Sequence, residues 1–156
     1  MSQTHVVTCS PLDASSFAPF GQVLATEPDE AVISVLGGED WILNVLSYDH
    51  EPLVCDHLNA HHKATQTLVP LSSAPALLIV APAGVTFSSP SDLESIRAFV
   101  MDGSCAINLA LGTWHWGPYP IGDHVELLNL QGRGFADDNE IADLLALLDT
   151  VVTASL

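Results

Sequence analysis

Two short polar segments carry the residue types best suited to chemistry. The first is Asn59-x-His61-x-x-x-x-Gln66, and the second is Gly112-x-x-His115. Residues two apart on a strand point to one face, so Asn59 and His61 should project together, with Gln66 and His115 reaching the same pocket from neighbouring strands. An imidazole exchanges protons near neutral pH. The spacing therefore predicts a polar pocket in which His61, His115 and Gln66 are the catalytic residues.

The same histidines allow two other interpretations. A divalent metal needs several imidazoles or carboxylates that converge, and His57, His61 and His115 could supply three imidazoles from one face. Asn59 and Gln66, however, are amides at positions where a metal centre would favour imidazoles or carboxylates. His61 and His115 could also be hydrogen-bonded structural residues. The sequence leaves the three interpretations open; the metal-free pocket is favoured, so no cofactor is expected.

The charge of the chain narrows its partners. Three Lys and Arg residues stand against nineteen Asp and Glu residues, a formal net charge of −16. Nucleic acids and anionic lipid surfaces are bound mainly by cationic side chains, so neither is an expected partner. The cations are Lys63, Arg97 and Arg133, and each is a candidate for holding an anionic ligand. Arg97 could instead pair with the neighbouring Glu94.

Length and composition predict one domain in the cytoplasm. The 156 residues are 48% hydrophobic, yet no apolar run approaches the roughly 18 residues of a membrane-spanning helix. The three cysteines are far apart and odd in number, which is not a disulfide framework. The first residues lack the basic and apolar regions of a signal peptide. The high apolar content favours a homo-oligomer with a buried interface.

Short β-like runs, separated by Gly, Pro and Ser turns, predict an all-β barrel or sandwich and not βαβ units. A strand is expected over 4–10, followed by a short helix with Asp13 as N-cap, Phe17 and Phe20 on one face, and Gly21 at its end. The further expected strands are 22–26, 31–36, 41–48, 53–59, 65–71, 76–81, 95–101, 105–111 and 125–131.

The last segment changes its hydrophobic period. An apolar stripe at helical spacing predicts an amphipathic helix over 135–156, outside a barrel formed by 1–134. Asp137-x-x-Glu140 resembles a capping box ahead of it. The stripe consists of Ile141, Leu144, Leu145, Leu148, Val151 and Val152.

The polar segments also resemble the metal-binding motifs of cupins, which are His-x-His followed by Glu and, later, Pro-x-Gly-x-x-His. Four stretches between about residues 10 and 134 carry a more specific likeness, to the ureidoglycolate lyases, cupin-type enzymes of purine nitrogen catabolism. These stretches are Leu12-x-x-x-x-Phe17-x-x-Phe20-Gly21-x-Val23-Leu24, His61-x-x-x-Thr65-Gln66-x-x-x-Pro70, Leu93-x-x-Ile96-Arg97-Ala98-Phe99-Val100-x-x-Gly103, and Ile107-Asn108 with Thr113-Trp114-His115-x-x-Pro118.

The resemblance implies a dimeric, cupin-like β-barrel that splits ureidoglycolate into glyoxylate and urea. His61 and His115 would transfer protons, while Gln66 and Asn108 would hold urea or carboxylate. The other substrate-binding candidates are Asn59, Lys63, Arg97, Trp114 and Arg133.

Two positions depart from the family pattern. Asn59 stands where family members carry Glu, and Leu130-Gln131-Gly132-Arg133 stands where a strand of the family ends in Asp-Arg. Because an amide cannot act as a base, two alternatives stay open. One is a divergent cupin enzyme for another small polar substrate, with or without a metal, and the other is a non-catalytic binding barrel.

Overall fold

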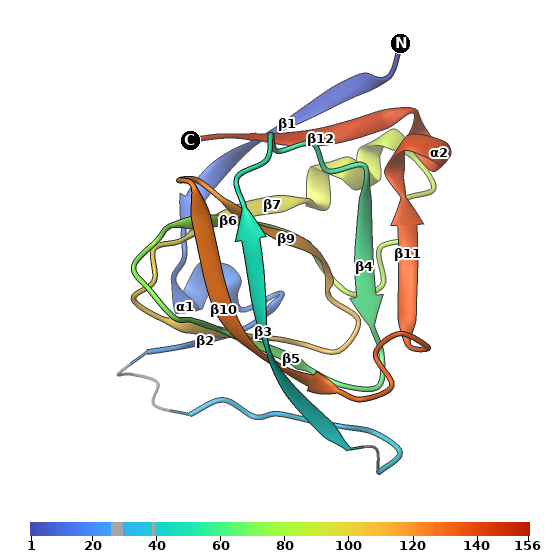
Figure 1. The fold of residues 1–156 in the computed structure, drawn as a ribbon. Coiled ribbons are helices and arrows are strands. Elements are labelled where there is room, and N and C mark those ends of the chain that lie inside the picture. The colour runs from blue at the N-terminus through green and yellow to red at the C-terminus, as the bar shows by residue number, and fades with distance from the viewer. Residues whose placement is uncertain (26–29, 39) are drawn as a thin grey trace.

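A computed structural model describes residues 1–25, 30–38 and 40–156. Its strands form two curled sheets that face each other as a β-sandwich (Figure 1). The seven-stranded sheet contains, in order, β11 (Asn139–Asp143), β4 (His57–His61), β9 (Trp114–Pro120), β6 (Ala76–Ala81), β7 (Arg97–Met101), β1 (Gln3–Pro11) and β12 (Thr150–Ser155). The five-stranded sheet contains β2 (Gly21–Leu24), β8 (Ala106–Leu109), β5 (Gln66–Pro70), β10 (His124–Gly132) and β3 (Trp41–Asp49).

Three short helices complete the described part of the fold. They are α1 (Ala14–Phe17), the 3-10 helix η1 (Pro90–Ser95) and α2 (Leu144–Leu148). No helix in the described part of the chain is long and apolar enough to cross a membrane. Most strand pairs are antiparallel, but β1 runs parallel to both β12 and β7. Its pairing with β12 places the first and last strands side by side at the top of Figure 1.

Side chains of the seven-stranded sheet alternate between two hydrophobic cores. Along β6, Leu78 and Val80 pack between the sheets with residues such as Phe99 and Leu127. Ile79 and its neighbours of the same parity pack on the opposite face, beneath η1 and α2. Since strand side chains alternate in direction, each β6 residue is assigned to a core by its position alone. This explains why all six β6 residues are buried.

The prediction of a mainly β fold with a short N-terminal helix is confirmed. Asp13 is the N-cap of α1, where its side chain accepts hydrogen bonds from the backbone N–H groups of Ser15 and Ser16. Phe17 and Phe20 are buried against Phe99. Most of the expected strands occur with shifted ends, and residue 26 of the expected strand 22–26 lies outside the described residues.

The expected strand over 31–36 is wrong. Within 30–38 the structure has only an isolated bridge, between Val35 and Ala64. The segment lies against the five-stranded sheet, because Val32 O accepts a hydrogen bond from Asn108 Nδ2. The apolar residues that suggested a strand therefore belong to a strap that crosses a sheet.

The prediction of a C-terminal helix over 135–156 is also wrong for most of that range. Only Leu144–Leu148 is helical; β11 joins the seven-stranded sheet beside β4, and β12 pairs with β1. Asp143 caps the helix, and Asp149, in the left-handed conformation, ends it after five residues. The β-branched run that follows favours a strand. The predicted stripe is consequently divided, with Leu144 buried and Ile141 exposed.

Candidate active site

The strand pairing brings the two polar segments together. Asn59 on β4 lies directly opposite His115 on β9. His57, Asn59 and His61 share one face of β4, because Leu58 and Ala60 are buried on the other. A cleft of about 390 Å³ opens between the sheets at this point. It is lined by Leu46, Tyr48, Asn59, His61, Gln66, Leu68, His115, Trp116, Gly117, Asn129, Gln131, Phe135, Ala136 and Asn139.

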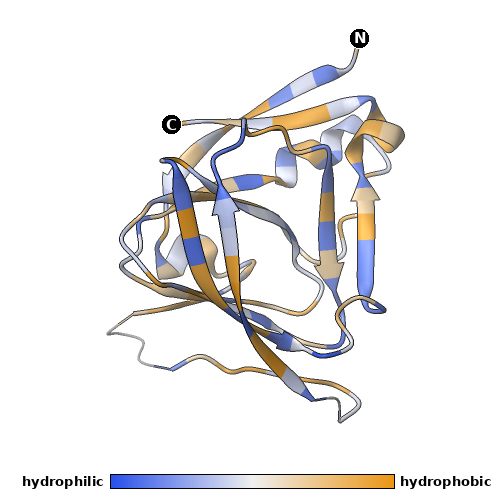
Figure 2. Ribbon diagram, in the orientation of Figure 1, coloured by the Kyte–Doolittle hydropathy of each residue, from blue (hydrophilic) through white to orange (hydrophobic). Residues whose placement is uncertain are grey.

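The cleft continues the hydrophobic interior of the sandwich, but with polar walls. Along β10, Val125 and Leu127 belong to the core between the sheets, whereas Asn129 and Gln131, at the following positions of the same parity, line the cleft. Hydrophilic and hydrophobic residues appear as blue and orange bands along β10 in Figure 2. One strand therefore supplies both the core and the site, and the residue type changes where the site begins.

Both cleft histidines have a defined tautomer. His61 Nδ1 lies 3.3 Å from the backbone oxygen of Asp138, and His115 Nδ1 lies 3.0 Å from the backbone oxygen of Thr113. A carbonyl oxygen only accepts hydrogen bonds, so each Nδ1 carries a proton and donates it. In the neutral ring, Nε2 is then the acceptor. The ring centres are 5.4 Å apart, so two basic nitrogens share one small site.

Burial keeps these rings neutral near pH 7. Loss of hydration lowers the pKa of His115 to about 4, and the hydrogen bond to Thr113 opposes this only partly. Burial also lowers the pKa of His61, against the opposing effect of Asp138. The neighbouring His61 ring lowers the pKa of His115 further, and the neighbouring His62 ring lowers that of His61. The resting site therefore holds two uncharged imidazoles.

Side-chain amides orient one another around the rings. Asn139 Nδ2 donates to Asn59 Oδ1 over 3.1 Å, which leaves Asn59 Nδ2 as a donor. Gln66 Nε2 donates to Asn129 Oδ1, and Asn129 Nδ2 donates to Asn44 Oδ1, both over 2.9 Å. The cleft thus offers hydrogen-bond donors and acceptors of fixed direction without ionised side chains among its described lining residues.

Asp138 connects the turn between β10 and β11 to the end of β4. Its carboxylate accepts hydrogen bonds from the backbone N–H groups of His62, at 3.0 Å, and Lys63, at 2.7 Å. Its backbone oxygen receives the proton of His61 Nδ1. Asp138 therefore positions the His61 ring and selects its tautomer without lining the cleft itself.

Two predicted substrate-binding residues lie away from the cleft, for the same geometric reason. Ile107 and Leu109 occupy the core between the sheets, so Asn108 points to the outer face of its sheet, where it bonds to Thr67 and to the strap at Val32. Trp114 precedes the inward His115 and packs in the opposite core, with its indole N–H donating to Val85 O. The pleat of each strand places both side chains outside the site.

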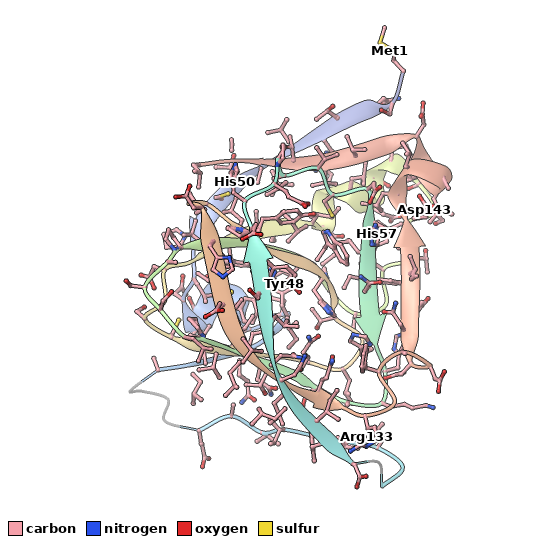
Figure 3. All side chains as sticks on the ribbon, viewed as in Figure 1. Met1, Tyr48, His50, His57, Arg133 and Asp143 are labelled. Atoms are coloured by element: carbon pink, nitrogen blue, oxygen red, sulfur yellow. The ribbon has the colours of Figure 1, made fainter. Side chains whose placement is uncertain are left out.

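The three cations are also outside the lining of the cleft. Arg97 is exposed and donates to the backbone oxygens of Glu94 and Ile96, not to the Glu94 carboxylate. Arg133 faces Asp40 at 3.4 Å, and Figure 3 shows it near the start of β3, far from His57. Lys63 is exposed in the turn after β4. None of the three contributes a lining side chain to the cleft.

The residues present do not fit the alternative metal centre. His57 stacks on Trp116, with ring centres 4.2 Å apart, and its Nδ1 bonds to Asp56. It therefore does not join His61 and His115. Within residues 1–25, 30–38 and 40–156, no three His, Cys, Asp or Glu side chains are grouped as metal ligands. The other polar groups of the cleft are amides, which are poor substitutes for imidazole or carboxylate.

Several site residues were missed from the sequence. Asn129 and Asn44 face each other across β10 and β3, and Asn139 lies opposite His61 on β11. The alternation Val125-x-Leu127-x-Asn129-x-Gln131 contained the signal for the β10 residues, since polar residues there continue an apolar face. Asn139 could not be found because its segment was expected to be helical.

A curled β-sandwich with a polar cleft at one end defines the class, a cupin-like protein. The chain belongs to the ureidoglycolate lyase family of enzymes, whose model matches residues 31–146. It is 31% identical over 129 residues to a ureidoglycolate lyase from Pseudomonas fluorescens, covering 71% of this chain and 75% of that one.

Other relatives show similar sequence identities. A ureidoglycolate lyase from Stutzerimonas stutzeri is 30% identical over 148 residues, covering 83% of this chain and 85% of that one. One from Burkholderia mallei is 28% identical over 170 residues, covering 95% and 96%. Among solved structures, RmlC from Streptococcus suis in complex with dTDP-D-xylose matches 60% of this chain and 44% of that one, with 16% identity and a TM-score of 0.42.

Proposed function

We propose that this protein cleaves ureidoglycolate to glyoxylate and urea by proton transfer at His61, while His115 orients the substrate. One observation carries the proposal: two neutral imidazoles, 5.4 Å apart, share an uncharged polar cleft. Membership of the ureidoglycolate lyase family supplies the substrate.

The reaction requires one proton to change place. The hydroxyl of the substrate loses its proton, its oxygen forms the carbonyl of glyoxylate, and the carbon–nitrogen bond breaks. The departing nitrogen takes up a proton and leaves as urea. Since no net proton is gained or lost, a neutral imidazole can accept the hydroxyl proton and return it to nitrogen.

We assign this transfer to His61. Its Nε2 is available because Nδ1 is committed to Asp138, and it is less buried than His115. A weakly basic ring with a pKa of about 4 stays neutral, so His115 Nε2 serves as a hydrogen-bond acceptor that orients the substrate. The imidazolium formed on His61 would then lie near the lone pair of His115 Nε2.

Asn59 has a binding role in this proposal and not a basic one. Asn139 occupies its Oδ1, so Nδ2 is left to donate to the carboxylate of the substrate. An amide donor at this position, with other neutral donors around it, would bind an anion without a cation. The departure from Glu at position 59 then changes how the substrate is held, while His61 still supplies the base.

The test is glyoxylate release from ureidoglycolate by purified variants. His61→Gln should lower kcat by about 10²–10⁴-fold, the usual contribution of one positioned acid or base. His115→Gln should mainly raise KM. His124→Gln, at the far end of β10 and outside the cleft lining, is the matched control and should retain activity. Full activity of His61→Gln would contradict the assigned role, and no turnover by the wild type would remove the lyase proposal.

Asn59 also favours a second candidate, an enzyme acting on a different small hydroxy-acid amide. A donor at this position suits a carboxylate or carbonyl oxygen of several such compounds. Measuring aldehyde release from a panel of hydroxy-acid amides, with ureidoglycolate included, separates the candidates by kcat/KM.

The single-domain organisation and the cytoplasmic location stay predictions.

We further infer that the protein acts as a homodimer through the outer face of the five-stranded sheet. Leu43 and Val45 on β3 are 62% and 52% exposed, and they lie opposite Leu130 and Leu128 on β10. An antiparallel sheet normally presents polar residues to water. In a chain of charge −16, this uncharged apolar patch is where two copies approach with little repulsion.

Sedimentation of the wild type should show a dimer at micromolar concentration. Leu43→Glu, which places a charge in the patch, should shift the protein to monomer. Leu147→Glu is the control, because Leu147 is similarly exposed at 55% but lies on α2. A monomeric wild type, or equal effects of both variants, would contradict this interface.

A further inference from the structure

Gln66 has one side-chain atom for which the described residues supply no partner. Its Nε2 donates to Asn129, but its Oε1 is buried and has no hydrogen-bond partner within residues 1–25, 30–38 and 40–156. Buried acceptors without a partner are uncommon and costly, so such an atom in the wall of a site points to a ligand donor. Gln66 lines the cleft, which makes a bound molecule the natural source of that donor.

The direction of the Gln66 amide is imposed by two residues behind it. Asn44 Oδ1 accepts from Asn129 Nδ2, so the carbonyl of Asn129 is turned to Gln66. Gln66 must then present its NH₂ group to Asn129, and its oxygen is directed elsewhere. Asn129 is fully buried, at 0% exposure, and both ends of its amide are used. We call the chain formed by Asn44, Asn129 and Gln66 the amide relay.

The surroundings of Gln66 limit the size of the donor. Beside the cleft is a recess of about 10 Å³, shared by His61, Gln66, Gln131 and Phe135. This is room for one group of the size of water, such as a terminal NH₂. Asp138 also borders the recess, and its carboxylate is engaged with backbone N–H groups. The recess is therefore small, and one of the residues that border it, Gln66, has an unused neutral acceptor.

We propose that Gln66 Oε1 accepts a hydrogen bond from the terminal NH₂ of the ureido group, and that Asn129 and Asn44 are positioning residues that turn this oxygen to the substrate. The assignment rests on the proposed function and adds to it a rule of selectivity. A ligand with a methyl group in place of the terminal NH₂ fits the same space but leaves Oε1 unpaired. The site should therefore favour carbamoyl compounds over the corresponding acetyl compounds.

N-carbamoylglycine and N-acetylglycine form the matched pair of probes. They differ only in NH₂ against CH₃, and neither has the hydroxyl needed for cleavage. Calorimetric titration of the wild type should show about tenfold tighter binding of N-carbamoylglycine, the effect of one hydrogen bond to a buried acceptor. Gln66→Leu should reduce the preference to less than about twofold.

Asn44 variants separate positioning from simple structural support. Asn44 is exposed, so its replacement should leave folding intact. Asn44→Ala removes the acceptor at the end of the relay; the preference should fall below about threefold, and the KM for ureidoglycolate should rise with kcat little changed. Asn44→Asp keeps an oxygen that accepts from Asn129 and should preserve the wild-type preference.

Equal wild-type affinities for the two probes, or binding of neither, would overturn the assignment. A preference that persists unchanged in both Gln66→Leu and Asn44→Ala would do the same. Glyoxylate release by the same wild-type preparation reports on the lyase separately. Turnover without the preference rejects the relay alone, and the preference without turnover rejects the lyase but keeps a carbamoyl-binding site.

Discussion

At the scale of single residues, position in the fold changes what a histidine can do. His124 is exposed beside Asp49 and Glu126, and hydrogen bonding to Asp49 raises its pKa. His115 is buried against a backbone carbonyl, and its pKa falls to about 4. The same side chain is therefore a cation at mildly acidic pH in one place and a neutral acceptor in the other.

The buried His115 should make the protein less stable in acid. Its folded pKa of about 4 lies below the ordinary value of 6.5, so between these values the unfolded chain binds more protons. The free energy of unfolding should accordingly fall as the pH is lowered, by about 2 kcal/mol between pH 7 and pH 5 from this residue. Urea unfolding of the wild type and of His115→Asn at both pH values measures the difference. An equal pH dependence in the two proteins would contradict it.

At the scale of elements, one turn holds the end of β4 in place. The turn after β10 carries Asp138, which bonds to the backbone after β4 and to the His61 ring. The end of β4 is thereby joined to β11 by more than the strand pairing. The orientation of His61 therefore depends on Asp138, which is remote in sequence and is not part of either polar motif.

Replacing Asp138 by Ala should weaken both the turn and the site. Loss of its bonds to the backbone N–H groups should lower the free energy of unfolding by about 1–3 kcal/mol. The variant keeps the backbone oxygen that accepts from His61 Nδ1, but the turn that carries this oxygen loses its bonds to β4, so kcat should fall as well. Asp137→Ala is the matched control, because the Asp137 side chain makes no hydrogen bond to any described residue and its backbone N–H, which the variant keeps, donates to Gly134 O. Thermal unfolding and glyoxylate release check the two effects, and identical behaviour of the two variants would contradict this role.

At the scale of the whole molecule, a strongly negative protein surrounds a cleft whose described lining is uncharged. The protein carries a formal charge of −16, while the described lining of the cleft has no ionised side chain. An anionic substrate is repelled at long range and is met in the cleft by neutral donors. Salt screens the repulsion but leaves the short hydrogen bonds nearly unchanged.

The value of kcat/KM for ureidoglycolate should therefore rise several-fold as ionic strength increases from about 10 mM to 200 mM. Steady-state kinetics in sodium chloride measure this, with kcat expected to change little. A fall in kcat/KM with salt would instead show that Lys63, Arg97 or Arg133 attracts the substrate, as the sequence suggested. Single Ala variants of the three cations would then identify which one acts.

The fold class, the first helix and part of the candidate site could be predicted from the sequence, because local patterns decide these features. The recurring short apolar runs predicted a mainly β fold, Asp13 predicted the start of a helix, and strand spacing placed Asn59 and His61 on one face. The family motifs identified the ureidoglycolate lyases. In each case the deciding interaction lies within a few residues along the chain.

The tertiary structure alone decided which polar residues share the site. Asn108 and Trp114 had suitable types, but the pleat directs them to other faces, whereas Asn129, Asn44 and Asn139 enter through strand pairing. The apolar stripe of the last segment became two strands and one helical turn, since pairing with β4 and β1 stabilises extended chain there. Contacts between distant strands set these outcomes, and a linear pattern carries no record of which strands will meet.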